Sequence, residues 1–368
     1  MNFRFFVVII LLPLLAACVQ HEKKMSETEM IQDVLLVLSY PYLLNNCAIT
    51  GISPQGPVTQ ITSGYGMRGT HQVAVAPLQN PIADRRVCVY YPADQSSPAP
   101  VLFLFHGFSS PSAEPYYPLI DFYVSKGYVV VFPIYFSDTR PPTQNYDIMW
   151  AGLKFAVDTF PSKIDTRKVG FMGHSYGGGA TPYMAHKGLF EQSWGSLGSF
   201  MYLAAPWYSF STTNANLTDF TNATKLIVQV YEEDQTNDHR MGIDIFNSVT
   251  SIASTERSYQ VIHTDSYGGY TLKSDHYVPI KDTILGIGAL NGYDFYGVWR
   301  QLDALTDYAF NGTAAGANTA LGSGNGNFSM GTYPDGSAVR RMDFTRSPAP
   351  LQAESYYSQQ WSNSLNPR

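Results

Sequence analysis

The sequence predicts an α/β fold with a mostly parallel central sheet and helices on both faces, and three observations support this. Short, continuously apolar runs alternate with stretches of helical periodicity from about residue 71 to residue 310. This pattern is typical of strands that are buried on both faces. The 368 residues include 45% hydrophobic side chains, which is enough for a large core. A G-x-S-x-G pentapeptide at residues 173–177 separates one apolar run from a helical stretch.

The expected elements follow one another regularly. Residues 72–76 and 87–91 are expected to form an antiparallel pair at a sheet edge. The continuous apolar runs expected as further strands are 101–105, 128–132, 168–172, 199–204, 225–231 and 259–264. Helical periodicity covers 147–160, the stretch from residue 176 to about 187, and 291–310.

The remaining segments suggest four parts: residues 1–17, 18–70, 71–310 and 311–368. We interpret 18–70 as a tether and N-terminal extension, with a capping box at 26–29 before a short helix. Residues 71–310 form the main domain. Residues 311–368 are interpreted as a linker and C-terminal extension: 312–326 is a Gly/Ala/Asn-rich flexible linker, and 327–345 is a small hairpin or cap that turns at Asp335-Gly336.

Composition argues against several classes of partner. The formal net charge is −6 and no basic run occurs, so we expect no binding to nucleic acid. No Cys/His spacing typical of a metal site is present, and we expect neither a metal nor a cofactor.

The first 18 residues have the pattern of a targeting segment. Arg4 supplies a positive charge, and residues 5–15 form an apolar run that is short for a membrane span. The run ends in Leu15-Ala16-Ala17-Cys18, which resembles the lipobox of bacterial lipoproteins. The resemblance implies a signal peptide at 1–17, lipid on Cys18, and a lipid-anchored protein of the bacterial cell envelope. A valine after the cysteine resembles an outer-membrane sorting signal.

Two further cysteines, Cys47 and Cys88, would then lie in an oxidising compartment. A disulfide between them is possible there. Cys88 falls in the expected strand 87–91, so a buried free thiol is the alternative.

Ser175 is the candidate nucleophile. It lies between an expected strand and an expected helix, and its glycine neighbours allow the two elements to approach closely. Such a turn holds the serine hydroxyl at the carboxyl edge of the sheet, where amides at the start of the helix can stabilise negative charge.

A serine nucleophile needs a base and an acid that orients the base. The acid is expected after the strand 225–231, where Asp234 and Asp238 are both candidates. We favour Asp234 because it lies closer to the end of the strand. The base is expected after the last strand, and His276 occupies that place. The other candidates for the base lie at less suitable positions in the sequence: His106, His174, His239 and His263.

An oxyanion hole needs two backbone amides. One is expected from Tyr176, which follows the nucleophile directly. The other is expected from Phe108 in the turn His106-Gly107-Phe108, after the strand 101–105.

Aromatic residues near these motifs offer an apolar pocket for substrate. Trp207 and Tyr208 follow a strand, and Trp150 and Tyr176 are further candidates, although aromatic side chains are also ordinary core residues.

Three stretches, LFHGF at 104–108, IDTRKVGFMGHSYGG at 164–178 and DH at 275–276, carry a family resemblance. With them, residues 71–310 resemble bacterial α/β-hydrolases of the cutinase-like, platelet-activating-factor-acetylhydrolase-like and chlorophyllase-like group. The resemblance implies hydrolysis of a small-molecule or lipid-like carboxylic ester through an acyl-enzyme. Dienelactone hydrolases share the architecture but use a cysteine where this chain has Ser175. The alternatives are a non-catalytic surface lipoprotein that binds through the same fold, and a serine peptidase or amidase.

Overall fold

The computed structural model describes residues 46–48, 51, 53–108, 110, 112–136, 140–282, 286–322, 328–362 and 364–366. They belong to one compact unit, Asn45–Arg368. The expected signal peptide, Cys18 and the short helix after the capping box lie outside the described residues. Among the helices of the described part, none is both long enough and apolar enough to cross a membrane.

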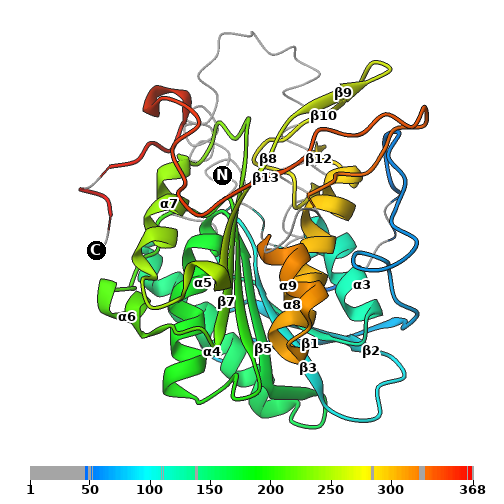
Figure 1. Ribbon diagram of the computed structural model, residues 1–368. Coiled ribbons are helices and arrows are strands. Elements are labelled where there is room, and N and C mark those ends of the chain that lie inside the picture. Colours follow the sequence, from blue (N-terminus) through cyan, green and yellow to red (C-terminus); the bar gives the residue numbers. More distant parts are fainter. Residues whose placement is uncertain are drawn as a thin grey trace, which may run out of the picture. The chain divides into compact units, whose positions relative to one another are not determined.

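Within the described residues, nine strands form the central sheet in the spatial order β1-β2-β4-β3-β5-β6-β7-β8-β13 (Figure 1). Their bounds are β1 Val73–Gln79, β2 Arg86–Pro92, β3 Ala99–Phe105, β4 Val129–Pro133, β5 Ile164–His174, β6 Ser199–Ala204, β7 Thr224–Tyr231, β8 Arg257–Ile262 and β13 Asp343–Thr345. Strands β3 to β8 pair in parallel, whereas β1, β2 and β13 join antiparallel. The expectation of a mostly parallel sheet with an antiparallel pair at one edge is confirmed.

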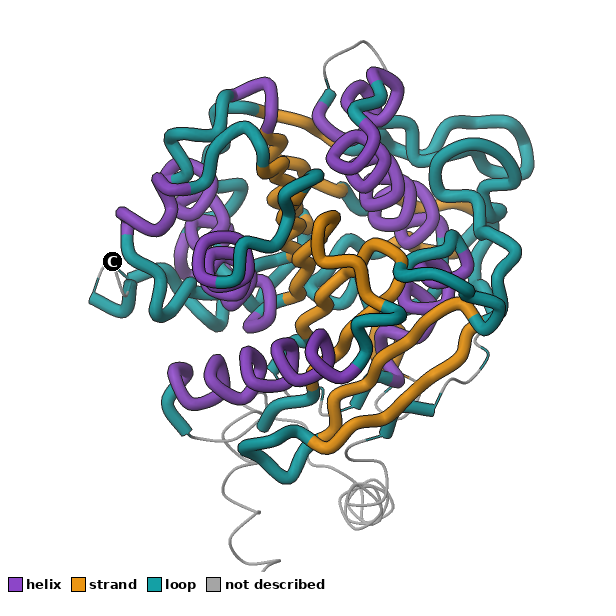
Figure 2. Tube along the Cα trace, turned by 90° about the horizontal axis from the view of Figure 1, so that it is seen from below, coloured by secondary structure: helices purple, strands orange, loops and turns teal. Residues whose placement is uncertain are grey.

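Helices cover both faces of the sheet (Figures 1 and 2). Helices α4, α5 and α7 bury apolar side chains on one face, and α3 and α8 do so on the other. The helix bounds are α3 Tyr117–Ser125, α4 Pro142–Thr159, α5 Tyr176–His186, α6 Asn214–Asp219, α7 His239–Ser248, α8 Arg300–Asn311 and α9 Ala314–Leu321. Shorter elements are η1 Glu114–Tyr116, η2 Lys187–Glu191, η3 Ser254–Glu256, η4 Tyr293–Trp299, η5 Glu354–Tyr356, β9 Asp265–Tyr267, β10 Tyr270–Leu272, β11 Lys281–Asp282 and β12 Ile287–Gly288.

The order of the strands creates a topological switch point at the carboxyl edge of the sheet. From β3 the chain passes through α3 to β4 on one face, and from β4 it returns through α4 to β5 on the other face. The loops that leave β3 and β5 therefore diverge above the carboxyl ends of two adjacent strands. In open α/β sheets this switch point is the usual place for a ligand.

Two C-terminal segments differ from expectation. The expected flexible linker contains helix α9, which Thr313 caps at its amino end and Gly322, with φ +68°, terminates at its carboxyl end. It forms because Ala320 and Leu321 are buried in the core beside α8, a contact that composition does not reveal. The hairpin turn at Asp335-Gly336 is present, but the chain beyond it becomes β13, which extends the main sheet at β8.

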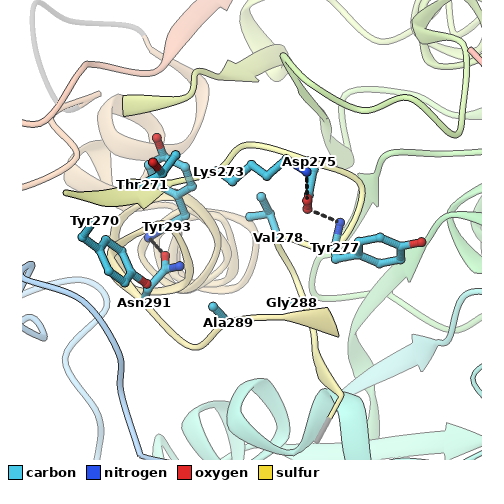
Figure 3. A pocket seen from close by; sticks show the side chains of 10 residues that line it. All are labelled: Tyr270, Thr271, Lys273, Asp275, Tyr277, Val278, Gly288, Ala289, Asn291 and Tyr293. Carbon is cyan, nitrogen blue, oxygen red and sulfur yellow. Dashed lines mark hydrogen bonds and ion pairs between the residues drawn. The ribbon is translucent and has the colours of Figure 1, made fainter. Parts of the chain in front are cut away.

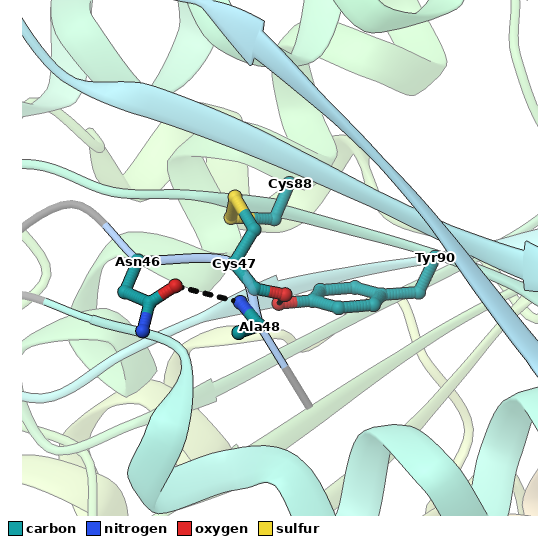
Figure 4. Close-up of a disulfide and its surroundings, with 5 residues drawn as sticks. All are labelled: Asn46, Cys47, Ala48, Cys88 and Tyr90. Atoms are coloured by element: carbon teal, nitrogen blue, oxygen red, sulfur yellow. Dashed lines mark hydrogen bonds between the residues drawn. A yellow bond between two sulfur atoms is a disulfide. The ribbon is translucent and has the colours of Figure 1, made fainter. Parts of the chain in front are cut away.

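A disulfide joins Cys47 to Cys88, with the two Cα atoms 5.5 Å apart (Figure 4). Both cysteines are buried, and the Tyr90 hydroxyl donates to the Cys47 carbonyl at 3.1 Å. The bond ties the segment before β1 to strand β2. Because the cysteines are 41 positions apart in the sequence, the chain-entropy model assigns the bond a stabilisation of about 4 kcal/mol.

Candidate active site

Ser175 occupies a strained turn between β5 and α5. Its backbone has φ 57° and ψ −118°, which non-glycine residues rarely adopt. A Cβ on Gly173 would lie 2.1 Å from the Gly177 carbonyl oxygen, and one on Gly177 would lie 2.3 Å from that of Phe105. Both positions therefore need glycine. Backbone hydrogen bonds hold the turn, from Ser175 to Ala204 and from Gly179 and Trp207 to the Ser175 carbonyl.

His276 joins Ser175 to Asp234. Its Nε2 lies 2.9 Å from the Ser175 Oγ, and its Nδ1 lies 2.7 Å from the Asp234 Oδ2. A carboxylate can only accept, so Nδ1–H donates to Asp234 and leaves Nε2 free to accept from the serine hydroxyl. All three side chains are buried. In the sequence Ser175 is 101 positions and Asp234 is 42 positions from His276. The fold brings all three into one hydrogen-bonded chain.

The environment of Asp234 keeps its carboxylate ionised. Burial raises the pKa of the carboxyl, but attraction to His276 and hydrogen bonds from His276 and from the Thr236 amide more than offset that effect. The pKa therefore lies below the ordinary aspartate value. A buried carboxylate that stays charged can orient a neighbouring imidazole and stabilise its protonated form.

Asp238, the alternative candidate for the acid, contacts other residues and does not bond His276. Its carboxylate caps α7 by accepting from the Arg240 amide at 3.0 Å, and it forms an ion pair with the Arg240 guanidinium at 2.9 Å. It also accepts from the Trp361 amide at 3.1 Å. The structure thus brings Asp234, and not Asp238, to His276.

The turn after β3 lies against Ser175. A Cβ on Gly107 would lie 3.3 Å from the Ser175 Cβ, so this turn approaches the serine closely. The Phe108 and Tyr176 rings are 6.1 Å apart. In the part of the chain that the structure describes, neither the Phe108 amide nor the Tyr176 amide has a protein acceptor. Tyr176 starts α5, where first-turn amides lack intrahelical acceptors.

A network that sequence reasoning missed connects the two loops beside Ser175. The Gly107 amide donates to the Tyr116 hydroxyl at 2.7 Å, and that hydroxyl lies 2.9 Å from the His174 Nδ1. The His174 Nε2 donates to the His276 carbonyl at 2.8 Å. His174 therefore accepts at Nδ1, and a single neutral tautomer satisfies every partner. Burial, together with the nearby His276, lowers the pKa of His174 to about 3.

His106 stiffens the turn after β3 in a similar way. Its ring stacks on Tyr135 with 3.8 Å between centroids, its Nδ1 donates to the Gly107 carbonyl at 2.8 Å, and its Nε2 accepts from the Tyr135 amide at 3.2 Å. Burial lowers the pKa of His106 to about 3. Neither His106 nor His174 touches the Ser175 hydroxyl, and both act through the loops that they hold.

Asn237 is a second residue that sequence reasoning missed. Its side-chain amide donates to the Ala205 carbonyl at 2.9 Å and to the Ser175 Oγ at 3.4 Å. Nothing in the local pattern distinguishes it from an ordinary polar loop residue. Its position depends on the course of the loop after β7.

Aromatic side chains surround the serine. The Tyr176 ring stacks on Trp207 at 5.5 Å and on Tyr135 at 5.2 Å. Phe108 is 50% exposed beside this group, so the serine lies next to an apolar surface that solvent reaches. Trp150, a further candidate, contacts Trp194 with 5.6 Å between the ring centroids.

A cavity of about 170 Å³ lies beside the loop that carries His276 (Figure 3). Asp275 and Tyr277 line it, but neither His276 nor Ser175 does, and a Lys273–Asp275 ion pair of 3.1 Å closes one side. The cavity is thus separate from the chain of hydrogen bonds. Within the described residues, no group of three or more His, Cys, Asp or Glu side chains is placed to hold a metal ion.

Comparison with protein-family models finds none that matches the chain, and no curated protein sequence matches it significantly.

The two buried neutral histidines predict a pH-dependent stability. An unfolded histidine titrates near 6.5, whereas His106 and His174 titrate near 3 in the folded chain. Below about pH 6.5 these two histidines bind protons in the unfolded state but remain neutral in the folded state. The free energy of unfolding therefore falls as the pH falls. Each histidine should contribute roughly 1.4 kcal/mol per pH unit in this range.

Urea unfolding followed at pH values from about 7 to about 5 measures this slope. The variant His174→Gln should show a shallower slope than the unsubstituted chain, because one titrating group is gone. A free energy of unfolding that stays constant over this range would contradict the neutral state of both histidines.

Proposed function

We propose that this chain is a serine carboxylic-ester hydrolase with the α/β-hydrolase fold, acting through an acyl-enzyme on Ser175. The observation that carries the proposal is the buried chain of hydrogen bonds from Ser175 through His276 to Asp234, beside two amides without acceptors. The parallel strands β3 to β8 and the strained turn after β5 are compatible with that fold.

In the proposed reaction, the Ser175 Oγ attacks the ester carbonyl carbon while His276 Nε2 takes the hydroxyl proton. The Phe108 and Tyr176 amides donate to the oxyanion that forms. Asp234 stabilises the resulting imidazolium, which then protonates the departing alcohol. Water, deprotonated by His276, then attacks the acyl carbon, the bond to the Ser175 Oγ breaks, and His276 returns the proton to the serine as the acid is released.

The surroundings of Ser175 favour esters with an apolar group. Tyr176, Trp207 and the half-exposed Phe108 offer aromatic surface beside the nucleophile. A panel of p-nitrophenyl esters with acyl chains of increasing length tests this preference. A protein that only binds a ligand on the same fold would not need the hydrogen-bonded arrangement of Ser175, His276 and Asp234.

We also propose that lipid on Cys18 anchors the enzyme to the bacterial cell envelope, with the outer membrane as the expected site. The support is the apolar run that ends in Leu15-Ala16-Ala17-Cys18. The tether expected after Cys18 would let the catalytic unit reach ester substrates at the membrane.

The variant Ser175→Ala should abolish ester hydrolysis and leave the fold intact, because the hydroxyl forms the covalent bond and alanine fits the turn. Hydrolysis of p-nitrophenyl butyrate and labelling by a fluorophosphonate probe are the two measurements. Ser199→Ala is the control, since Ser199 lies at the amino end of β6 and bonds Thr224. An unlabelled, inactive parent chain would favour a binding protein.

The two aspartates should respond differently to amidation. Asp234→Asn should lower kcat by roughly 10⁴-fold, because His276 loses the partner that fixes its tautomer and stabilises its charge. Asp238→Asn should cost far less, since asparagine also caps helices. Steady-state kinetics of both variants decide the matter, and a severe loss in Asp238→Asn with a mild one in Asp234→Asn would reverse the assignment.

The mature protein should carry a diacylglyceryl group on Cys18 and partition with membranes. Intact-mass measurement of the detergent-extracted protein checks the modification, and Cys18→Ser is the matched control that should remain unmodified. A soluble product cleaved at another position would contradict lipid anchoring.

A further inference from the structure

The C-terminal segment 352–362, here called the strap, pairs with the loop 234–238, here called the acid loop. The Ser358 amide donates to the Gln235 carbonyl at 2.7 Å, and the Gln359 amide donates to the Thr236 carbonyl at 2.7 Å. In return the Gln359 carbonyl accepts from the Asp238 amide at 3.0 Å. The two segments run parallel at this point. Figure 1 shows the strap as the red segment beside α7.

The opposite side of the acid loop holds the reacting groups. The Thr236 and Asn237 amides donate to the Asp234 Oδ1 at 2.7 and 3.0 Å. The Asn237 side chain bonds the Ala205 carbonyl and the Ser175 Oγ. Thr236 therefore uses its amide for the catalytic carboxylate and its carbonyl for the strap, so that one peptide segment connects the two.

Side chains anchor the strap on both flanks of this pairing. Tyr357 is 2% exposed and packs on the His239 ring at 5.2 Å. The Trp361 amide donates to the Asp238 carboxylate, and the Trp361 ring stacks on Tyr208 at 5.5 Å. The Tyr208 hydroxyl donates to the Gln360 carbonyl at 3.0 Å. The strap is thus fixed by buried and hydrogen-bonded contacts along its length.

We infer that the strap is a positioning element of the active site, which holds the acid loop in the conformation that points Asp234 at His276 and Asn237 at Ser175. The inference rests on the proposed function for its catalytic consequence. The short acid loop carries five residues, and its carbonyls at Gln235 and Thr236 take their described backbone donors from the strap. Without the strap these carbonyls would accept hydrogen bonds from water instead, and the loop would adopt alternative conformations.

The expected cost is catalytic rather than global. A displacement of a catalytic group by about 1 Å can lower a rate by roughly 10²-fold. The sheet, its helices and the strained turn at Ser175 do not depend on the strap for their backbone pairing. Among the described residues, the strap makes no hydrogen bond to the Phe108 amide or to His276. Its loss should therefore lower kcat much more than it changes KM.

The experiment compares the full chain with three variants. One ends at Leu351 and lacks the strap. Gln359→Pro removes the amide that donates to Thr236, because proline has no N–H and restricts the preceding residue. Gln359→Ala is the matched control at the same position: the glutamine side chain is exposed, and its hydrogen bonds to the acid loop are made by its backbone.

Two readouts separate positioning from mere stability. The first is the kcat and KM for p-nitrophenyl butyrate at a temperature where thermal melts show each variant folded. The second is the far-downfield proton resonance of His276 Nδ1–H, which reports the hydrogen bond to Asp234 whether or not the chain turns over an ester. If the truncated chain does not fold, Gln359→Pro and its alanine control still decide the question.

We expect Gln359→Ala to match the full chain and Gln359→Pro to lose about 10²-fold in kcat with little change in KM. The downfield resonance should broaden or disappear in Gln359→Pro and in the truncated chain. A truncated or proline variant that is folded, keeps kcat and keeps the resonance would overturn the inference. A full chain that shows the resonance but hydrolyses no ester would instead refute the proposed function, and the resonance in the variants would still test the strap.

Discussion

The backbone of Ser175 is the constraint on which the rest of the site depends. A non-glycine residue at φ 57° and ψ −118° is strained. It persists because Gly173 and Gly177 let β5 and α5 approach within distances that no Cβ would tolerate. The same turn aims the hydroxyl out of the sheet and places the Tyr176 amide at the start of a helix. The strain and the two features that the proposed mechanism needs, an accessible nucleophile and an oxyanion donor, therefore arise from one local geometry.

The groups around Ser175 are arranged so that burial, which usually opposes charge, is compatible with the proposed chemistry. His106 and His174 respond to burial by staying neutral, and each then uses one donor and one acceptor to hold a loop. Asp234 is buried as well, but His276 and nearby amides keep its pKa low. In the proposed mechanism His276 and Asp234 carry the charge, and the two neighbouring histidines stay neutral and hold the loops.

Sequence patterns predicted the sheet well and the connections poorly, for physical reasons. Strands β3, β4 and β6 consist almost entirely of apolar residues, because helices cover both faces of the sheet, and so they are recognisable in a short window. Helix α9 is built from small residues and forms because Leu321 is buried in the core. Helix α3 begins beside a proline and is apolar nearly all round, so it lacks a clear period.

Chain order was sufficient to nominate Ser175 and His276, and distance from the end of β7 favoured Asp234 over Asp238. The contacts of Asp238 with Arg240 and Trp361 depend on long-range folding that no local pattern records. The network through Tyr116 and the pairing of the strap with the acid loop are equally invisible, since they consist of backbone bonds and residues far apart in the chain.

The most direct measurement of the central claim is to trap the covalent intermediate. The purified protein is mixed with a p-nitrophenyl ester, quenched in acid after a short reaction time, digested and mapped by mass spectrometry. The account predicts that the mass of the acyl group appears on the peptide that contains Ser175, and disappears as the substrate is exhausted. Turnover of the ester with the acyl group on another residue, or with none on Ser175, would contradict it.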